Sequence, residues 1–383
     1  MTEPQKIRVA VLYGGRSGEH EVSLLSAANV IQYLDRSRFE VVPIGIDREG
    51  AWFLGDDVFK KELTAPALRL VRDAQRKLFN PDFIGKQLTA IQPTQLLPPV
   101  NSNGRLFDVV FPVIHGVLCE DGTVQGLLEL ADVPYVGCGV LSSAVGMEKD
   151  ISKRLVNAAG IHVPPYLTIK KGQWTENPKR FCHAVVDQLN LPVFVKPANT
   201  GSSVGVEKVK RIEDLPAAID AAFQYDNKVI VEQGIDAIEL EVAVLEAAHY
   251  GADPIVSVVG EIKPRHEFYS YAAKYLDAEG AELLIPASIT PTLQERVRDT
   301  AKKIFNVLEC EGMARVDLFL ERNTENIYFN EINTLPGFTQ ISMYPKLMEA
   351  SGVKYSELLS HLVMLAIDRH QRKAKLSYEY VSP

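Results

Sequence analysis

The sequence predicts an α/β domain of the doubly wound type at the N-terminus, followed by two lobes of the α+β type. Over the first third of the chain, apolar stretches of strand length alternate with amphipathic stretches of helix length, which is typical of a mostly parallel sheet covered by helices. After the Pro164-Pro165 pair, short strands and helices are interleaved instead. A chain of 383 residues is also too long for one typical core. We therefore expect domains at residues 1–145, 146–235 and 236–383.

Hydrophobic periodicity, together with helix start and stop signals, gives the expected elements in chain order. In the first domain we expect strands at 7–13, 39–46 and 107–114 and helices at 22–34 and 123–131. In the central lobe we expect helices at 149–159, 178–189 and 212–223 and strands at 166–169, 193–196, 206–209 and 228–232. In the last lobe we expect strands near 239–245 and 255–259 and a helix that starts at Pro291 after Thr290. Prolines interrupt the weaker pattern of 47–105, which we interpret as a surface elaboration, and the charged tail from Arg369 predicts a frayed helix end.

Composition and charge argue against several classes of protein. The net charge of −8 and the pI near 5.6 argue against a nucleic-acid partner, because nucleic-acid phosphates bind basic surfaces. The four cysteines have no spacing typical of a zinc site or of paired disulfides, so we expect reduced thiols. We find no apolar stretch suited to a signal core before the first strand or to a membrane span. We expect a cytoplasmic protein with small-molecule substrates.

A predicted hairpin in the last lobe combines acidic and amide side chains. If its turn is centred near Thr324, Asp317 lies opposite Glu331 and Arg315 lies opposite Asn333. Strand side chains alternate between faces, so these residues project on one side of the sheet. Opposed carboxylates repel unless a cation lies between them, and carboxylate and amide oxygens are hard ligands suited to Mg²⁺ or Mn²⁺. We therefore predict half of a nucleoside triphosphate site; a hairpin whose polar face meets only water is the alternative.

A lysine at the end of a predicted strand is followed by a loop rich in glycine and hydroxyl groups, KPANTGSSVG from Lys196 to Gly205. Gly201 and Gly205 permit close approach of the backbone to a ligand, and backbone amides with the hydroxyls of Ser202 and Ser203 can bind phosphate oxygens. The loop is not a Walker A sequence, because no lysine follows the second glycine. We interpret it as a mobile cover over phosphate groups; a flexible turn that carries serines by chance is the alternative.

Two further loops follow predicted strands and open helices, a position where ligands bind in open α/β sheets. In GGRSGEHEVSL, which starts at Gly14, the carboxylate of Glu19 suits an ammonium group, whereas Ser17 is better explained as a helix cap. In HGVLCEDGT, which starts at His115, a lone histidine is more often structural than catalytic.

The stretch 263–280 has no regular period and is rich in aromatic residues. Irregular segments of this length inside compact enzymes commonly cover a ligand, so we expect a lid. From this lid Lys274 and Tyr275 can reach the site, whereas Tyr269 and Tyr271 are better explained by packing on the core.

These segments, in this order, resemble the D-alanine:D-alanine ligase family of the ATP-grasp enzymes, and the resemblance runs over nearly the whole chain. Each motif alone is weak or moderate, but the set with its spacing is specific to the family. The motifs are GGRSGEHEVSL at 14–24, HGVLCEDGTVQG at 115–126, MEKDISK at 147–153, KPANTGSSVG at 196–205, YAAKY at 271–275, ARVDLF at 314–319 and NEINTLPGFT at 330–339.

The resemblance implies an ATP-grasp fold, in which the two α+β lobes clasp ATP beside the N-terminal domain. It implies the ATP-dependent ligation of two D-alanines through an acyl phosphate, a step that supplies a precursor of the peptidoglycan cell wall. It also implies ATP as a substrate, two Mg²⁺ or Mn²⁺ ions and a homodimer formed through the first domain.

The resemblance further implies roles for individual residues, which fall into three groups. The ATP-binding group comprises Lys149, Lys196, Ser202, Ser203 and Lys274, Glu232 with the backbone of Gln233 and Ile235 at the adenine, and Glu239 at the ribose. The metal ligands are Asp317, Glu331 and Asn333. The substrate-binding and catalytic group comprises Glu19, His115, Ser202, Tyr275, Arg315, Gly337 and Ser342. In this group Glu19 binds the ammonium of the first D-alanine, and Arg315 stabilises the tetrahedral oxyanion.

Three alternatives remain open. A depsipeptide ligase would use D-lactate as its second substrate, but Tyr275 favours the dipeptide because relatives with the other preference lack this tyrosine. Another ATP-grasp carboxylate–amine ligase would share the metal hairpin but not the segment around Glu19. A nucleotide-binding sensor without turnover would lack either the metal ligands or the oxyanion arginine, and this chain has both.

Overall fold

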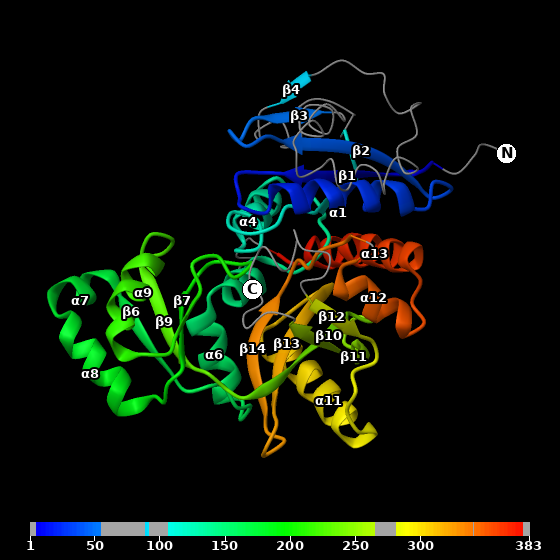
Figure 1. The fold of residues 1–383 in the computed structure, drawn as a ribbon. Coiled ribbons are helices and arrows are strands. Elements are labelled where there is room, and N and C mark those ends of the chain that lie inside the picture. The colour runs from blue at the N-terminus through cyan, green and yellow to red at the C-terminus, as the bar shows by residue number, and fades with distance from the viewer. Residues whose placement is uncertain (1–4, 55–88, 92–105, 265–280, 340, 378–383) are drawn as a thin grey trace, which may run out of the picture.

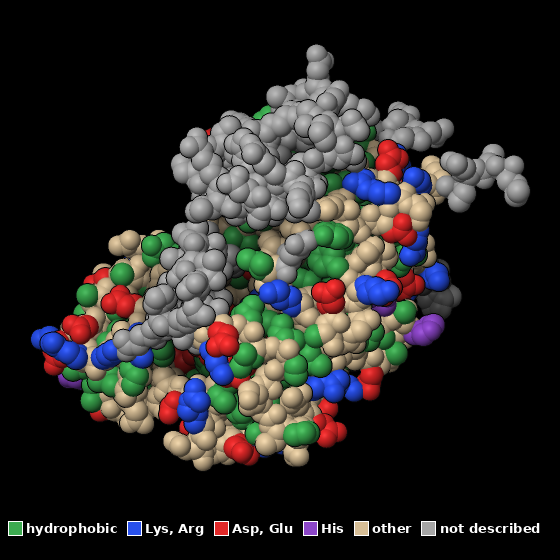
Figure 2. Space-filling view, turned by 45° about the vertical axis from the view of Figure 1, so that its right-hand side comes forward, with side chains coloured by type: hydrophobic (Ala, Val, Ile, Leu, Met, Phe, Trp, Pro, Cys, Tyr) green, Lys and Arg blue, Asp and Glu red, His purple; other side chains and the backbone are tan. Residues whose placement is uncertain are grey.

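The computed structural model describes residues 5–54, 89–91, 106–264, 281–339 and 341–377, and the strands within these ranges form three sheets (Figure 1). Each sheet falls inside one of the three expected domain ranges, whose boundaries stay predictions. On the face drawn in Figure 2, basic and acidic side chains are interspersed rather than separated. Among the described residues, no helix has the length and apolar character needed to cross a bilayer.

Parallel strands form the centre of the N-terminal sheet, as the alternation of strands and helices predicts. β1 (Ile7–Gly14) pairs in parallel with β2 (Phe39–Ile46) on one side and with β5 (Val109–Pro112) on the other. Helix α1 (His20–Tyr33) packs against β1, and α4 (Thr123–Leu130) follows β5 along the chain. The middle of β1 is apolar and buried throughout, as a strand covered on both faces requires.

Two short strands extend this sheet within the segment that we expected to be a surface elaboration. β3 (Trp52–Leu54) pairs antiparallel with β2, and β4 (Thr89–Ile91) pairs antiparallel with β3, which gives the order β4-β3-β2-β1-β5. Residues 55–88 and 92–105 lie outside the described residues. Part of the elaboration is therefore an antiparallel edge added to a parallel sheet.

The central lobe is an antiparallel sheet with helices packed against it. Its strands, in the spatial order β6-β9-β7-β8, are β6 (Tyr166–Lys170), β7 (Val193–Pro197), β8 (Glu207–Val209) and β9 (Lys228–Gln233). Its helices are α7 (Lys171–Glu176), α8 (Pro178–Gln188) and α9 (Leu215–Ala222), the last preceded by a 3₁₀ turn at Ile212–Asp214. Trp174, Val195 and Ile219 lie in the apolar core that joins these layers.

The C-terminal lobe is built on a second antiparallel sheet. Its strands, in the order β12-β11-β10-β13-β14, are β10 (Ala237–Leu245), β11 (Ile255–Pro264), β12 (Ala281–Leu284), β13 (Met313–Glu321) and β14 (Ile327–Asn333). Helix α11 (Pro291–Val307) packs on β10, β11 and β13, and Thr290 caps it by accepting a hydrogen bond from the Leu293 N–H. Helices α5 (Val140–Met147) and α6 (Lys149–Ala158) contact β14, and α6 lies between this sheet and the central lobe (Figure 1).

The alternation of side chains along β13 separates the core from the site. Ala314, Val316 and Leu318 belong to the apolar cluster beneath α11. Arg315 and Asp317 therefore project from the opposite face of the sheet.

The last helix packs on the N-terminal domain, a contact that the sequence pattern did not predict. Helix α12 (Met343–Ala350) packs on β10 and β11, and α13 (Tyr355–Lys373) packs on α1 and β5 (Figure 1). The expectation of a frayed end from Arg369 onward is wrong: the helix continues to Lys373, and Arg369 is only 6% exposed.

Candidate active site

A row of carboxylates crosses three strands of the C-terminal sheet on the face opposite α11. Glu241 on β10 lies beside Asp317 on β13, which in turn lies beside Glu331 on β14. The expected pairing of Asp317 with Glu331, and of Arg315 with Asn333, is confirmed. Glu241 extends the row by a third acidic side chain that the hairpin alone could not reveal.

A β-bulge determines which residues of β14 face this row. The pairing shifts by one residue after Asp317, and Asn330 is the extra residue of the bulge. The shift allows Phe329 and Ile332 to enter the same apolar core while Glu331 keeps its place in the row. With strict alternation, those two apolar side chains would point to opposite faces.

Cationic side chains already compensate part of the charge in the row. Arg315 donates from Nε and Nη2 to the two oxygens of Asp317, each at 2.7 Å, and its Nε lies 3.1 Å from Glu241 Oε2. Lys149 Nζ lies 3.7 Å from Glu331 Oε2. Protein side chains therefore relieve part of the repulsion between the opposed carboxylates without a metal ion. Three carboxylates still face two cations, so the row keeps a negative charge, and its hard oxygen donors fit Mg²⁺ or Mn²⁺.

The start of α6 joins this row to the glycine-rich loop of the central lobe. Lys149 Nζ donates to the carbonyl oxygen of Thr200, and the Lys149 N–H donates to Ala198 O at 2.9 Å. Ser202 and Ser203 have φ values of +50° and +58°, in the left-handed region that L-residues seldom adopt. Lys149 thus fixes the base of the loop, and the tip of the loop forms a tight turn.

The same loop closes over a buried acidic cluster of the N-terminal domain. One ligand atom each from Glu19, His115 and Glu120 lies within 4.8 Å of the others. A Cβ atom at Gly201 would lie 3.1 Å from Glu19 Oε1 and 3.7 Å from Glu120 Oε2, so only glycine fits there without displacement. The expectation that Ser17 caps the helix is wrong: Glu19 is the N-cap residue of α1, and none of the described side chains caps the helix. The Ser17 hydroxyl instead accepts the Glu19 N–H at 3.2 Å, in a turn just before the helix.

His115 connects the acidic cluster to the C-terminal lobe. Its ring nitrogens lie 3.0 Å from the Ser26 hydroxyl and 3.2 Å from the carbonyl oxygen of Leu335, and Nδ1 lies 3.5 Å from Glu120 Oε1. Burial alone would lower the pKa of His115, but Glu120, Glu19 and the Leu335 carbonyl outweigh it and raise that pKa above its ordinary value. The histidine therefore has both a structural contact and a place beside the expected substrate site.

Glu232, expected at the adenine, lies between two lysines. Its Oε1 accepts from Lys196 Nζ at 2.7 Å and its Oε2 lies 2.8 Å from Lys153 Nζ. Burial would raise the pKa of Glu232, but the two lysines outweigh burial and hold that pKa below its ordinary value. Glu232 is only 1% exposed, so the adenine ring can reach its carboxylate only if one of the two lysines moves. The N–H of Gln233 donates to Pro165 O at 2.8 Å, which leaves its carbonyl as the backbone group for a ligand.

The expected second-substrate residues form a compact turn before α12. The Ser342 hydroxyl accepts from the Thr339 N–H at 3.1 Å and lies 2.7 Å from Thr339 Oγ1. A Cβ atom at Gly337 would lie 2.9 Å from Ser342 Oγ. Upstream, Asn333 Oδ1 accepts from the Leu335 N–H at 2.9 Å, so this oxygen has one lone pair left for a metal ion.

The other predicted residues lie farther along or outside the described ranges. Ile235 is half-buried just after β9, and Glu239 is half-buried on β10 on the same face as Glu241. Lys274 and Tyr275, with most of the expected lid at 265–280, lie outside the described residues.

Sequence reasoning missed three residues that the structure places at the site. Lys153 lies four residues after Lys149, so both share one face of α6, and this spacing in MEKDISK was an available signal. Glu241 lies two residues after Glu239 on an expected strand, where the period of two predicts the same face. Glu120 gave no signal, because its approach to Glu19 depends on the tertiary fold.

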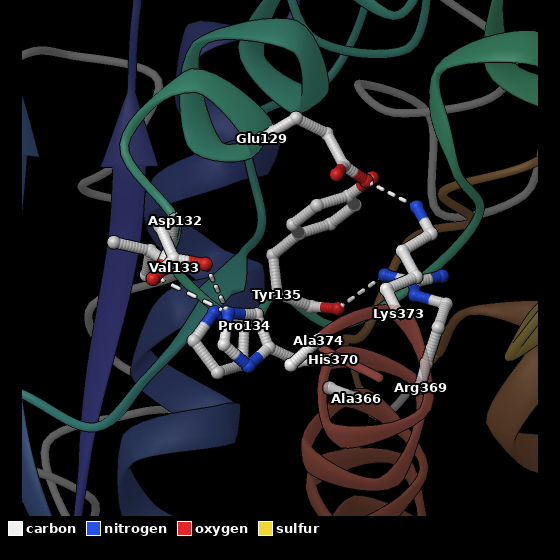
Figure 3. Close-up of a pocket in the computed structure, with 10 residues that line it drawn as sticks. All are labelled: Glu129, Asp132, Val133, Pro134, Tyr135, Ala366, Arg369, His370, Lys373 and Ala374. Carbon is white, nitrogen blue, oxygen red and sulfur yellow. Dashed lines mark hydrogen bonds and ion pairs between the residues drawn. The ribbon is translucent and has the colours of Figure 1, made fainter. Parts of the chain in front are cut away.

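A concavity of about 190 Å³ lies apart from these residues, between the end of α4 and α13 (Figure 3). Arg369 donates there to Tyr135 O at 2.7 Å and to Gly137 O at 2.6 Å, and Lys373 Nζ lies 2.5 Å from Glu129 Oε1. Nearby, a Cβ atom at Gly312 would lie 3.3 Å from the backbone of Gly137, so main chain meets main chain between the two domains. The charged groups are paired with one another, which indicates a junction between domains.

Comparison with known proteins decides the family. Models of the N-terminal and C-terminal parts of D-Ala–D-Ala ligases match residues 8–138 and 155–364. The chain belongs to the D-alanine–D-alanine ligase family. Its fold is accordingly the ATP-grasp fold of these ligases, as expected, with the carboxylate row and the glycine-rich loop on facing lobes.

Individual members of the family are similar over almost their whole length. The D-alanine–D-alanine ligase A of Bradyrhizobium diazoefficiens is 54% identical, with 98% of this chain and 99% of that protein covered. The D-alanine–D-alanine ligase structure from Coxiella burnetii has a TM-score of 0.78 and 36% identity, with 97% of each chain covered. The VanG D-Ala:D-Ser ligase structure from Enterococcus faecalis has a TM-score of 0.77 and 35% identity, with 94% of this chain and all of that chain covered.

Proposed function

We propose that this chain joins two D-alanines to D-alanyl-D-alanine at the expense of ATP, through an acyl phosphate, with release of ADP and phosphate. The observation that carries the proposal is the double contact of the glycine-rich loop. Gly201 lies against Glu19, while Thr200 accepts from Lys149 next to Glu331. An anionic pocket that suits an ammonium group therefore adjoins a lysine and carboxylates that suit a triphosphate with its metal ions.

Activation of the first D-alanine uses the acidic cluster and the loop. Glu19 holds the ammonium, and Ser202 with Tyr275 completes the network around it. Lys149 and Lys196 bind the phosphates with the hydroxyls and amides of the loop, so Lys196 leaves Glu232 when ATP binds. A carboxylate is a poor electrophile, and phosphorylation makes it one that an amine can attack.

The carboxylate row supports phosphoryl transfer and the attack of the second D-alanine. Asp317, Glu331 and Asn333 would hold two Mg²⁺ or Mn²⁺ ions, which neutralise charge on the transferring phosphoryl group when bound. Arg315, which lies beside Asp317 and Glu241 in this row, would direct its N–H groups to the tetrahedral oxyanion and stabilise it. Ser342 and the backbone near Gly337 position the second substrate.

A homodimer formed through the first domain, and a cytoplasmic location, are parts of the same proposal. Four free cysteines, of which Cys119, Cys138 and Cys310 are buried, agree with a reducing compartment. Gel filtration with light scattering tests the dimer.

Phosphate release from ATP, measured with and without D-alanine, tests the function. We expect release that depends on D-alanine and on Mg²⁺ or Mn²⁺, with D-alanyl-D-alanine identified by mass spectrometry. Parallel assays with D-lactate or D-serine as acceptor distinguish the depsipeptide and mixed-dipeptide ligases. Tyr275→Phe is expected to shift acceptance toward hydroxy acids. Phosphate release that ignores D-alanine would refute the proposal.

A further inference from the structure

Helix α6 directs two lysines into the space between the lobes, and the proposed reaction uses only one of them. Lys149 contacts the loop and the carboxylate row. Lys153, one turn later, is fully buried at 0% exposure and has no role in the chemistry described above. A lysine buried to this degree is costly unless it is paired, so its partners indicate what it does.

Three oxygen atoms surround the Lys153 ammonium. Its Nζ lies 2.8 Å from Glu232 Oε2, 2.8 Å from the Asn330 carbonyl oxygen and 3.3 Å from the Phe329 carbonyl oxygen. All three are acceptors, and only the charged form of lysine carries three N–H donors. The two carbonyls belong to the bulge of β14, whose backbone is not fully used by strand pairing. Lys153 is therefore fixed by backbone groups on one side and holds Glu232 on the other.

The two lysines on Glu232 are not equivalent. Lys196 lies at the end of β7 beside the glycine-rich loop, its side chain is 12% exposed, and the proposed reaction takes its ammonium to the phosphates. Lys153 has no exposed surface and two additional backbone partners. When Lys196 departs, Lys153 is the partner that stays.

We propose that Lys153 is the positioning residue that sets the selectivity for adenine, by keeping Glu232 a carboxylate after Lys196 has turned to the phosphates. This inference rests on the proposed function, in which Glu232 faces the adenine amino group. A carboxylate only accepts hydrogen bonds, so it binds the amino group of ATP and repels the carbonyl oxygen that inosine triphosphate carries at the same position. A protonated Glu232 would donate to that carbonyl and lose the discrimination.

Kinetics with ATP and inosine triphosphate test the proposal in the full-length protein. Lys153→Met removes the charge but keeps most of the apolar stem, and the ratio of kcat/KM for ATP to that for inosine triphosphate should fall by about tenfold or more. Equilibrium binding of each nucleotide by calorimetry should show the same loss of selectivity. Lys171→Met is the matched control, because Lys171 Nζ donates to a carbonyl, Phe223 O at 3.1 Å, in the same lobe without contacting Glu232. Its ratio should stay at the wild-type value.

The remaining outcomes separate this inference from its premise. Lys153→Arg, which keeps the charge, should retain a ratio within a few-fold of wild type. If Lys153→Met is not folded by circular dichroism, Lys153→Gln provides the uncharged variant. A folded, uncharged variant with the wild-type ratio would overturn the role of Lys153. A wild-type protein that releases no phosphate in response to D-alanine would instead overturn the proposed function.

Discussion

Arg369 provides the most direct test of how the C-terminal helix is attached to the N-terminal domain (Figure 3). The residue is 6% exposed, donates to the carbonyls of Tyr135 and Gly137 at 2.7 and 2.6 Å, and lies 3.4 Å from Glu311 Oε2. Its guanidinium carbon is 4.4 Å from the centre of the Tyr135 ring. We consider the substitution Arg369→Met, which keeps apolar packing but removes every donor.

The expected cost follows from the groups left behind. Each hydrogen bond from a charged donor contributes about 1.5–3 kcal/mol, and the two buried carbonyls would lose their partner. We therefore expect the free energy of unfolding to fall by about 3–5 kcal/mol. Lys373→Met is the matched control on the same helix, since the Lys373 side chain is 39% exposed and its ion pair with Glu129 should contribute about 1 kcal/mol or less.

Urea unfolding followed by circular dichroism measures both variants against wild type. The midpoint of the transition that includes the N-terminal domain should move several times further for Arg369→Met than for Lys373→Met. Equal shifts in the two variants would refute the reasoning, because they would mean that the buried carbonyls find other partners.

Three further predictions concern the candidate site. Glu241→Gln removes the second carboxylate next to Arg315, whose Nε lies 3.1 Å from Glu241 Oε2. In steady-state kinetics we expect kcat to fall by roughly tenfold with little change in KM. An unchanged kcat would contradict this prediction. Gly201→Val places a side chain against Glu19 and should raise KM for D-alanine by about tenfold or more, and by less for ATP; equal increases would argue against the contact. Because the folded-state pKa of His115 is raised, its protonated form stabilises the fold below its unfolded-state pKa, and this stabilisation is lost as pH rises through the folded-state pKa. The difference in unfolding temperature between wild type and His115→Gln should therefore shrink from about pH 6 to about pH 9, and a constant difference would exclude this linkage.

Local patterns in the sequence were sufficient for much of the fold. The strand at 39–46 was predicted with its observed bounds, and Thr290 was identified as a helix start because the signal lies within a few residues. The pairing of Asp317 with Glu331 was predicted from a hairpin centred near Thr324; beside the turn the observed register differs by one residue, and the bulge at Asn330 restores the predicted pairing. Each of these features depends on contacts that are close along the chain.

Features that depend on distant contacts were not predictable in the same way. Glu241 joins the row because β10 pairs with β13, about 76 residues away, and nothing local specifies that neighbour. The bulge at Asn330 responds to the core beneath the hairpin and to Lys153 on another helix. Arg369 looked like part of a solvated tail because its carbonyl partners lie 232 and 234 residues away.

The close approach of Gly137 and Gly312 has a consequence for redesign of the protein. Where two backbones touch without intervening side chains, their separation is set by the van der Waals radii of main-chain atoms and not by the volume of neighbouring side chains. Substitutions in the apolar core on either side should change how strongly the N-terminal domain binds the C-terminal lobe. They should leave the distance between the proposed ammonium site and the proposed phosphate site almost constant. The protein is thus a scaffold with a fixed distance between the two domains, onto which different loops that recognise the acceptor substrate can be grafted.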